Sequence, residues 1–481
     1  MKTSLSAEQT REISNRLHEA NNAFVKRYPG ETGRRQPVHT VYGGAHLFKS
    51  DSAQRLGSLA RRSLEQFAPD FLIFAKAVGL PGAETLPETL DTSSSQIARL
   101  YSNPNEARRE DKRLWMAYTI YKRVLDKLQR EPVEDFRIDF EDGYGNRPDE
   151  EEDGHAASAA TEVAAGMTNN TLSPFIGIRI KTLTEELKER SLRTLDIFVS
   201  TVVEKSGGRL PNNFVVTLPK VVMPEQVAAL ADIFDLLEPQ LGLASGSLKM
   251  ELMVETTQAI INERGESNLP LMLDAARGRC TAAHFGTYDY TASCNITAAH
   301  QHMTHPACDF ARNMMQVAFG GTGIWLSDGA TNIMPVAPHR ATEGGPQLTP
   351  AQIEENRATV HRAWKLHYDH IQHSLINAYY QGWDLHPAQL PTRYAAIYAF
   401  FLDSLEAASE RLSNFVEKAA KATLVGDVFD DAATGQGLLN YFLRAINCGA
   451  ITEQEALSLS SLTIQELRSG SFVKILKNRT Q

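Results

Sequence analysis

The chain has 481 residues, 42% of them hydrophobic and 22% charged, the balance of a folded globular protein with room for one large domain and a smaller one. Its formal net charge of −9 argues against an electropositive surface for nucleic acid or for an anionic membrane. The four cysteines form no C-x-x-C pair, so the sequence indicates neither a disulfide framework nor a zinc knuckle. Because the amino terminus is polar and no apolar run could cross a bilayer, we expect a cytoplasmic protein.

Strand-like and helix-like segments alternate along the chain. Amphipathic helices are predicted over residues 7–28 and 51–67, and mostly helical sequence follows from about 70 to 130. Apolar runs of strand length, suited to a sheet buried on both faces, lie at 38–42, 136–140, 175–180, 214–218, 249–254, 282–286, 323–327 and 382–386. Eight strands separated by helical segments are typical of a (β/α)8 TIM barrel.

The carboxyl-terminal part of the sequence is helical. An Ala-rich helix is predicted over 390–421, an interruption runs from Gly426 to Gly435, and shorter helices follow over 437–446 and 452–459. We therefore divide the chain into an N-terminal helical segment (1–36), a TIM-barrel catalytic domain (37–399) and a helical C-terminal extension (400–481).

Two acidic residues follow neighbouring predicted strands. Glu255 comes directly after the apolar run Leu248 to Val254, and Asp289 comes shortly after the run that contains His284. The carboxyl ends of barrel strands share one face, so the two carboxylates are expected side by side. Two carboxylates suit a hard cation, Mg²⁺ or Mn²⁺, whose remaining coordination positions stay open for water or substrate. The alternative is that each acid caps a helix or is a solvated loop residue.

A second acidic group follows the predicted strand at 136–140. Asp139, Glu141 and Asp142 crowd negative charge into four positions, which costs stability unless a metal, an arginine or water balances it. The acidic run from Arg147 to Asp153 is interpreted as a loop, in which part of this charge would be solvated.

Two basic residues lie at the ends of apolar strands. Arg179 lies within an apolar run, where an unpaired guanidinium is costly, so it must face an acid or a ligand such as a carboxylate or keto oxygen. Lys220 ends the following strand and could form a Schiff base, but a structural or electrostatic role beside the acids is favoured.

Two further motifs give weaker signals. The spacing of His300, His302 and His305 is not that of a helical zinc motif, and we give it little weight. The glycine-rich run from Gly320 to Gly329 lacks the spacing of a nucleotide-binding loop and is interpreted as a strand that ends in a loop.

Several motifs, in this order, resemble the malate synthase and citrate lyase β-subunit superfamily (HpcH/HpaI aldolase-like), with malate synthase the more similar. They are Asp139-Phe-Glu-Asp142, Leu218-Pro-Lys220, Val254-Glu255-Thr256, Gly286-Thr-Tyr-Asp289-Tyr, the His386-Pro-Ala-Gln389 near the end of the barrel, and Asp430-Asp431-Ala-Ala-Thr434, which is similar to the E-D-A-A-T of malate synthase. The resemblance covers about residues 38–450.

This resemblance implies a role for each matching residue. Glu255 and Asp289 would ligate Mg²⁺, and Arg179 would hold the oxo oxygen of a 2-oxo acid and stabilise its oxyanion. Backbone N–H groups around Gly286, Thr287 and Asp289 would hold the substrate carboxylate. Asp431 would move the proton on the reacting carbon, and Lys220 and Asp142 complete the expected catalytic set.

The expected activity is that of a Mg²⁺-dependent carbon–carbon lyase or aldolase, or the reverse Claisen or aldol condensation. It would act through an enolate on a 2-oxo acid and an acyl-CoA or small hydroxy acid, with no nucleic-acid or membrane partner and in a homo-oligomer. The alternatives are a hydrolase of malyl- or citramalyl-type thioesters on the same site, a non-catalytic binding protein, and a metal-independent Schiff-base aldolase that uses Lys220.

Overall fold

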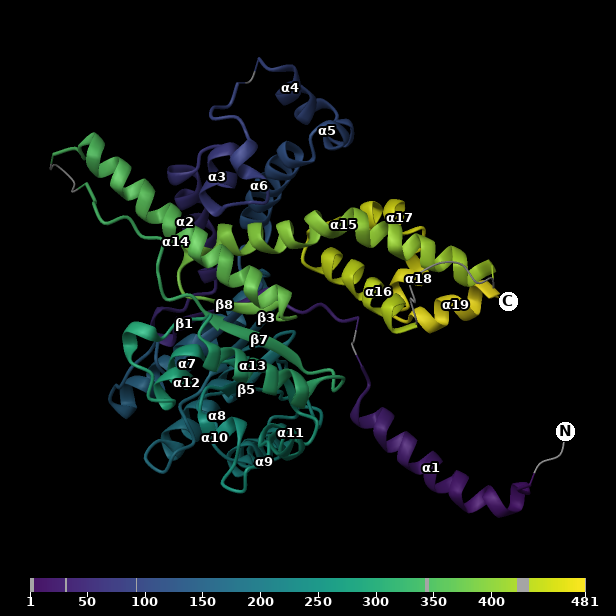
Figure 1. Ribbon diagram of the computed structural model, residues 1–481. Coiled ribbons are helices and arrows are strands. Elements are labelled where there is room, and N and C mark those ends of the chain that lie inside the picture. The colour runs from purple at the N-terminus through teal and green to yellow at the C-terminus, as the bar shows by residue number, and fades with distance from the viewer. Residues whose placement is uncertain (1–3, 31–32, 92, 342–345, 422–431, 481) are drawn as a thin grey trace.

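The computed structural model describes residues 4–30, 33–91, 93–341, 346–421 and 432–480. Its centre is a closed barrel of eight parallel strands in sequential order, in which β1 pairs with both β2 and β8 (Figure 1). The strands are β1 (His39–Gly44), β2 (Asp135–Asp139), β3 (Phe175–Arg179), β4 (Phe214–Leu218), β5 (Met250–Val254), β6 (Cys280–Phe285), β7 (Trp325–Ala330) and β8 (Gln381–Asp384). All eight predicted strands and the (β/α)8 TIM-barrel fold are confirmed.

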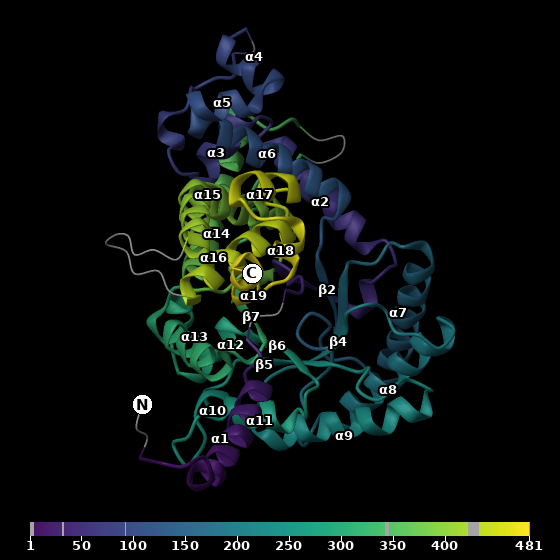
Figure 2. The same ribbon diagram turned by 90° about the vertical axis from the view of Figure 1, so that its right-hand side faces the viewer.

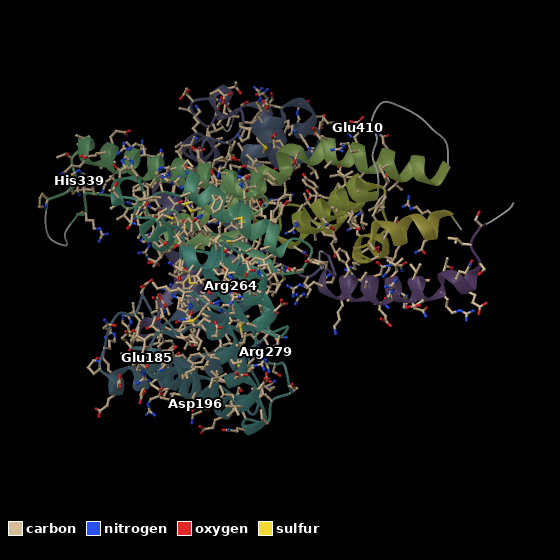
Figure 3. All side chains as sticks on the ribbon, turned by 60° about the horizontal axis from the view of Figure 1, so that its bottom comes forward. Glu185, Asp196, Arg264, Arg279, His339 and Glu410 are labelled. Atoms are coloured by element: carbon tan, nitrogen blue, oxygen red, sulfur yellow. The ribbon has the colours of Figure 1, made fainter. Side chains whose placement is uncertain are left out.

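Helices connect the strands and cover the outside of the barrel (Figure 2). The connection from β1 to β2 is the most elaborate and holds α2 (Ser52–Phe67), α3 (Phe71–Val78), α4 (Ser95–Ser102), α5 (Pro104–Glu110) and α6 (Lys112–Arg130). The later connections hold α7 (Asp149–Asn169), α8 (Lys188–Lys205), α9 (Pro224–Gln240), α10 (Thr257–Ile260), α11 (Leu269–Ala275), α12 (Thr287–Ser293), α13 (Pro306–Phe319) and α14 (Pro350–Ile376). Side chains fill the spaces between these helices and the sheet (Figure 3). No helix of the described ranges is long and apolar enough to span a bilayer.

The two ends of the chain add helices outside the barrel. The helix α1 (Ala7–Arg27) begins with a capping box at Ser6 and extends away from the barrel (Figure 1). The long α15 (Leu390–Lys421) carries α16 (Ala432–Asn447), α17 (Glu453–Ser460), α18 (Ile464–Arg468) and α19 (Phe472–Thr480). The expected border between residues 399 and 400 falls inside α15, so the barrel and the extension share one helix.

The helical extension contacts the amino-terminal ends of the strands. The guanidinium of Arg444 in α16 lies 4.0 Å from the ring centre of Tyr380, which directly precedes β8. Its Nη1 donates to Gln36 Oε1 at 3.2 Å, just before β1. The described part of α16 therefore lies at the opposite end of the barrel from the carboxyl ends of the strands.

One sequence prediction about the acidic segment is wrong. The run from Arg147 to Asp153 is not a loop, because α7 begins at Asp149 and takes four acids into its first turn. Negative charge at a helix N-terminus interacts favourably with the helix dipole, which explains why this acidic segment is helical. Glu152 is fully buried there, and its Oε2 lies 3.1 Å from Lys181 Nζ.

The barrel interior contains a buried layer of charge where branched aliphatic residues usually pack. Arg137 on β2 donates through Nε to Glu251 Oε2 at 3.0 Å and to Thr217 Oγ1 at 3.1 Å. It also pairs with Asp135, and Thr217 donates to Glu251 at 2.8 Å. This layer joins the side chains of β2, β4 and β5.

We expect Arg137→Met to lower the free energy of unfolding by about 3–5 kcal/mol, because it removes the buried guanidinium that pairs with both Asp135 and Glu251. Urea denaturation followed by circular dichroism measures this. Arg55→Met is the matched control, since Arg55 pairs with Asp51 on the surface of α2 and its loss should change stability little. Equal stabilities of the two variants would contradict a structural role for this layer.

Candidate active site

Acidic and basic side chains gather at the carboxyl ends of five consecutive strands. Asp139 ends β2, and Glu141 and Asp142 follow it. Arg179 ends β3, Lys220 follows β4, Glu255 follows β5, and Asp289 lies in α12 after β6. Because parallel strands end on one face, the fold brings these residues from distant parts of the sequence to the mouth of the barrel.

Arg179 is held from two sides. Its Nε and Nη2 donate to the two carboxylate oxygens of Asp139 at 2.7 and 2.6 Å, the geometry of a bidentate pair. The guanidinium also lies 4.8 Å from the ring centre of Tyr42 and 5.6 Å from that of Trp383. Only Nη1 is left outside the pair with Asp139, and it lies 3.1 Å from Glu141 Oε2. Arg179 thus has the acidic partner that the sequence required.

Lys220 links the carboxylates. Its side-chain Nζ pairs with Glu141 and lies 3.0 Å from Asp142 Oδ2 and 3.6 Å from Asp289 Oδ2. Its backbone N–H donates to Glu255 Oε1 at 2.7 Å, and its φ of +49° is in the left-handed region that non-glycine residues seldom adopt. Local backbone strain of this kind persists where the surrounding structure fixes a residue. Here the backbone amide of Lys220 is bonded to Glu255, and its ammonium is paired with Glu141 and Asp142.

The protonation of Lys220 bears on the Schiff-base alternative. Burial alone would lower the pKa of Lys220, but the carboxylates of Glu141, Glu255 and Asp289 raise it above its usual value. A lysine must lose its proton before it can attack a carbonyl carbon. The surroundings of Lys220 therefore favour the electrostatic role over a Schiff base.

Glu255 is buried in an excess of negative charge. Its side chain is 1% exposed, and burial followed by the charge of Asp289 raises the pKa of Glu255 to about 8. The carboxylates of Asp139, Glu141, Asp142, Glu255 and Asp289 outnumber the two cations Arg179 and Lys220. A divalent cation beside Glu255 and Asp289 would offset this excess.

The donor set fits a cation that keeps water ligands. Within the described ranges, no three His, Cys, Asp or Glu side chains form a group that could hold a metal by themselves. Mg²⁺ is commonly held by one or two carboxylates together with waters and substrate oxygens, so Glu255 and Asp289 suffice for it. The metal-ligating role of this pair stays a prediction.

Gly286 makes room for Glu255. A Cβ atom at Gly286 would overlap the Glu255 side chain, so the carboxylate can take its place only beside a glycine. The Gly286 N–H already donates to Val254 O at 3.1 Å. The first-turn N–H groups of α12, including those of Thr287 and Asp289, have no acceptor within the helix, and they stay the predicted carboxylate binders.

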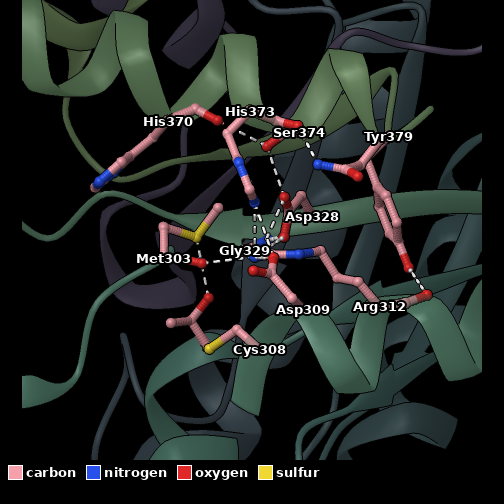
Figure 4. A network of polar contacts seen from close by, with 12 residues as sticks. Met303, Cys308, Asp309, Arg312, Asp328, Gly329, His370, His373, Ser374 and Tyr379 are labelled. Atoms are coloured by element: carbon pink, nitrogen blue, oxygen red, sulfur yellow. Dashed lines mark hydrogen bonds and ion pairs between the residues drawn. The ribbon is translucent and has the colours of Figure 1, made fainter. Parts of the chain in front are cut away.

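A buried network supports α12 from behind (Figure 4). Arg312 on α13 donates to Asp328 Oδ1 at 2.9 Å and to the backbone oxygen of Met303 at 2.7 Å. Ser374 on α14 donates to Asp328 Oδ2 at 2.6 Å. The sulfur of Met303 accepts from Thr287 Oγ1 at 3.0 Å. The network thereby fixes the start of α12, where Asp289 lies.

The histidine motif contributes to structure. His305 caps α13, with its Nδ1 accepting from the Ala307 N–H at 3.1 Å, and the rings of His302 and His305 are 5.7 Å apart. His302 Nδ1 lies 3.2 Å from Thr304 Oγ1. Asp431, the predicted base, lies outside the described residues.

Sequence reasoning missed Tyr42, His284 and Trp383. Each lies on a strand and faces the barrel interior near Arg179 or Glu251. The only signal in the sequence was their position within short apolar runs, where a polar or aromatic side chain is most often part of the core.

Fold and site together define a TIM barrel with a partly buried acidic cluster around one arginine and one lysine at its carboxyl-terminal mouth. The chain belongs to the family described as "Domain of unknown function (DUF6986)", whose model matches residues 17–475. No curated protein sequence matches it significantly.

Solved structures resemble the chain at low identity. The Haloferax volcanii malate synthase magnesium/glyoxylate complex is 13% identical, with a TM-score of 0.42 over 94% of this chain and 99% of that one. The citrate lyase beta subunit complexed with oxaloacetate and magnesium from M. tuberculosis is also 13% identical, with a TM-score of 0.33 over 55% of this chain and 87% of that one. Likeness at this level carries no conclusion about the reaction.

We expect Gly286→Ala to destabilise the protein by about 1–3 kcal/mol, because the added methyl group forces the Glu255 side chain and its strand apart. Gly154→Ala is the control, since its Cβ would meet open space on α7 and should raise helix stability slightly. Thermal unfolding of both variants measures the difference. A Gly286→Ala protein as stable as Gly154→Ala would contradict the close approach of Glu255.

Proposed function

We propose that the protein is a Mg²⁺-dependent carbon–carbon lyase, or the corresponding condensing enzyme, which acts through an enolate on a 2-oxo acid and an acyl-CoA or small hydroxy acid. The observation that carries this proposal is the buried Glu255 beside Asp289, because a divalent cation held by the two would offset their mutual repulsion at the mouth of the barrel. The order of the motifs that resemble malate synthase supports the same chemistry.

Arg179 would bind the oxo oxygen of the substrate. Asp139 occupies Nε and Nη2, so Nη1 is the nitrogen that can exchange Glu141 for a substrate oxygen. The fork with Asp139 fixes the direction of that N–H before substrate binds, so little reorganisation is needed as negative charge develops. Bound Mg²⁺, held by Glu255 and Asp289, would supply a Lewis acid that polarises the same carbonyl.

Lys220 would keep the acids of the site in place, Asp142 among them. The ammonium of Lys220 stays charged and holds Glu141 and Asp142 on one side of the mouth. Its backbone N–H holds Glu255, so one residue orients acids from two strand ends. In this role Lys220 sets the charge balance of the site and forms no covalent bond.

The base for the reacting carbon is assigned to Asp431 by the resemblance. The described part of α16 lies at the amino-terminal end of the barrel, opposite Glu255 and Asp289. In the expected homo-oligomer, Asp431 would serve either its own barrel mouth or that of a neighbouring subunit.

The first test is solvent deuterium exchange into pyruvate and into acetyl-CoA, followed by NMR with and without Mg²⁺. Metal-dependent exchange into one of them is expected, and it would identify the nucleophilic half of the reaction. Exchange should vanish in Glu255→Ala and Asp289→Ala and persist in the surface variant Glu263→Ala. Exchange that survives EDTA would contradict the metal assignment. Release of CoA without a change in oxo acid would favour the thioester hydrolase.

A second test addresses the base. Asp431→Asn should remove exchange while Mg²⁺ binding, measured by calorimetry, stays within about twofold of the wild type. Mixing Asp431→Asn with Glu255→Ala subunits should restore part of the activity if the base serves a neighbouring barrel, and restore none if it serves its own. Full activity in Asp431→Asn would show that another group is the base.

A further inference from the structure

The amino-terminal helix α1 carries an uncovered apolar stripe. Ile13, Leu17 and Phe24 are spaced by four and then seven residues, so they lie on one face of the helix, and each is more than half exposed. Every residue from 11 to 26 is exposed, so no other described part of the chain covers this face. Most of the stability of a helix in a protein comes from the packing of its apolar face. We therefore expect the stripe of α1 to pack on a partner.

A second exposed apolar surface lies on the outside of the barrel, where α11 packs against both α9 and α13. Val317 is 84% exposed and comes seven positions after Phe310, so both point outward from α13. The exposed large apolar side chains of these three helices, which we call the acceptor face, are Leu236, Leu271, Phe310 and Val317. Exposed apolar groups among polar ones are typical of a protein–protein contact.

The helix α1 is fixed beside the acceptor face but runs away from it. Arg27 in its last turn pairs with Asp274 on α11. The Gly30 N–H donates to Gly321 O at 2.8 Å, just after the end of α13. From there the 21 residues of α1 extend about 31 Å away from the barrel (Figures 1 and 2). Both apolar surfaces are thus open on a single chain, and a second copy offers each of them its counterpart.

Charge favours the same pairing. The three helices of the acceptor face contain one basic residue and six acids: Glu225, Asp232, Asp235, Glu238, Asp274 and Asp309. Two arginines just after α11 offset part of this acidic excess. The helix α1 has four basic and three acidic residues, and its Arg16 borders the stripe because it lies three positions after Ile13. The pair of Arg27 with Asp274 is a contact of the same kind within one chain.

We propose that α1 is exchanged between two copies of this chain. The stripe of one copy packs on the acceptor face of the other, and the second copy's α1 packs on the first in return. Because each α1 starts from a point next to its own acceptor face, the two contacts close around a two-fold axis. The oligomer is therefore a dimer built on α1. Neither surface contains a residue of the candidate active site, so the proposal is independent of the reaction.

The first test measures the mass of the full chain by sedimentation velocity over a range of concentrations. Twice the chain mass of 53.3 kDa is expected. Leu17→Glu places a charge in the stripe and should raise the dissociation constant of the dimer at least about tenfold. Asn15→Glu, on the opposite side of α1, is the matched control and should leave it unchanged. A monomer at every concentration, or equal association of the two variants, would overturn the proposal.

The second test addresses the acceptor face. Val317→Glu should weaken the dimer as much as Leu17→Glu does. Leu59→Glu is the control, since Leu59 is an exposed leucine on α2, away from the acceptor face. All of these side chains are exposed, so the circular dichroism spectrum of each variant should match that of the wild type. A Val317→Glu protein that associates as tightly as Leu59→Glu would mean that α1 packs elsewhere, and would overturn the proposal.

The third test identifies the two surfaces in contact. Leu17→Cys copies are mixed with Val317→Cys copies and treated with a short bis-maleimide, and a two-chain product is expected in the mixture only. The untreated-sequence chain, whose Cys280, Cys308 and Cys448 are buried, is the blank. A product from Leu17→Cys alone would mean that two α1 helices pair with each other. A cross-link within one chain that carries both substitutions would mean that α1 folds back on its own barrel. Either result, or no product in the mixture, would overturn the proposal.

Discussion

The balance of charge at the barrel mouth is the constraint on which the rest of the site depends. Carboxylates from two strand ends and one helix repel one another at short range, and burial of Glu255 makes that repulsion stronger. Arg179 and Lys220 offset it only because each contacts more than one acid. The left-handed backbone of Lys220 and the glycine at 286 follow from this requirement. The first accompanies the contacts of Lys220 with the acids, and the second leaves space for the Glu255 side chain.

The fold could be read from the sequence because parallel barrel strands are buried on both faces. Each becomes a short continuous apolar run, such as Phe214 to Leu218, and eight such runs between helical segments leave few alternatives. The acids at the strand ends were found for the same reason, since every strand ends on one face. The error at Asp149 to Asp153 arose because high charge suggests solvation, whereas at a helix start it is also stabilising.

The sequence could not predict which side chains contact one another across the barrel. Asp139 and Arg179 are 40 positions apart and read as separate features, although they form one fork. Tyr42 and Trp383 come from two strands, and nothing local marks their rings as neighbours of Arg179. Gly286 looked like a donor of a backbone N–H, yet its evident contribution is the space that Glu255 occupies. Such contacts depend on the register between strands and on the closure of the barrel, which no single segment of the sequence specifies.

The helix α15 has a mechanical consequence. It runs unbroken from Leu390 to Lys421, about 48 Å at 1.5 Å per residue, and carries the terminal helices on its distal part. Near its start, Arg393 grips Asp384 with Nη2 to Oδ1 at 2.8 Å, and Asp384 is the residue after Trp383. Because α15 is one continuous helix that is fixed near its start by this ion pair, a movement of its distal part is passed on to its first turns. A tilt of α16 to α19, for example when subunits assemble, would thus shift the position of β8, the strand that carries Trp383.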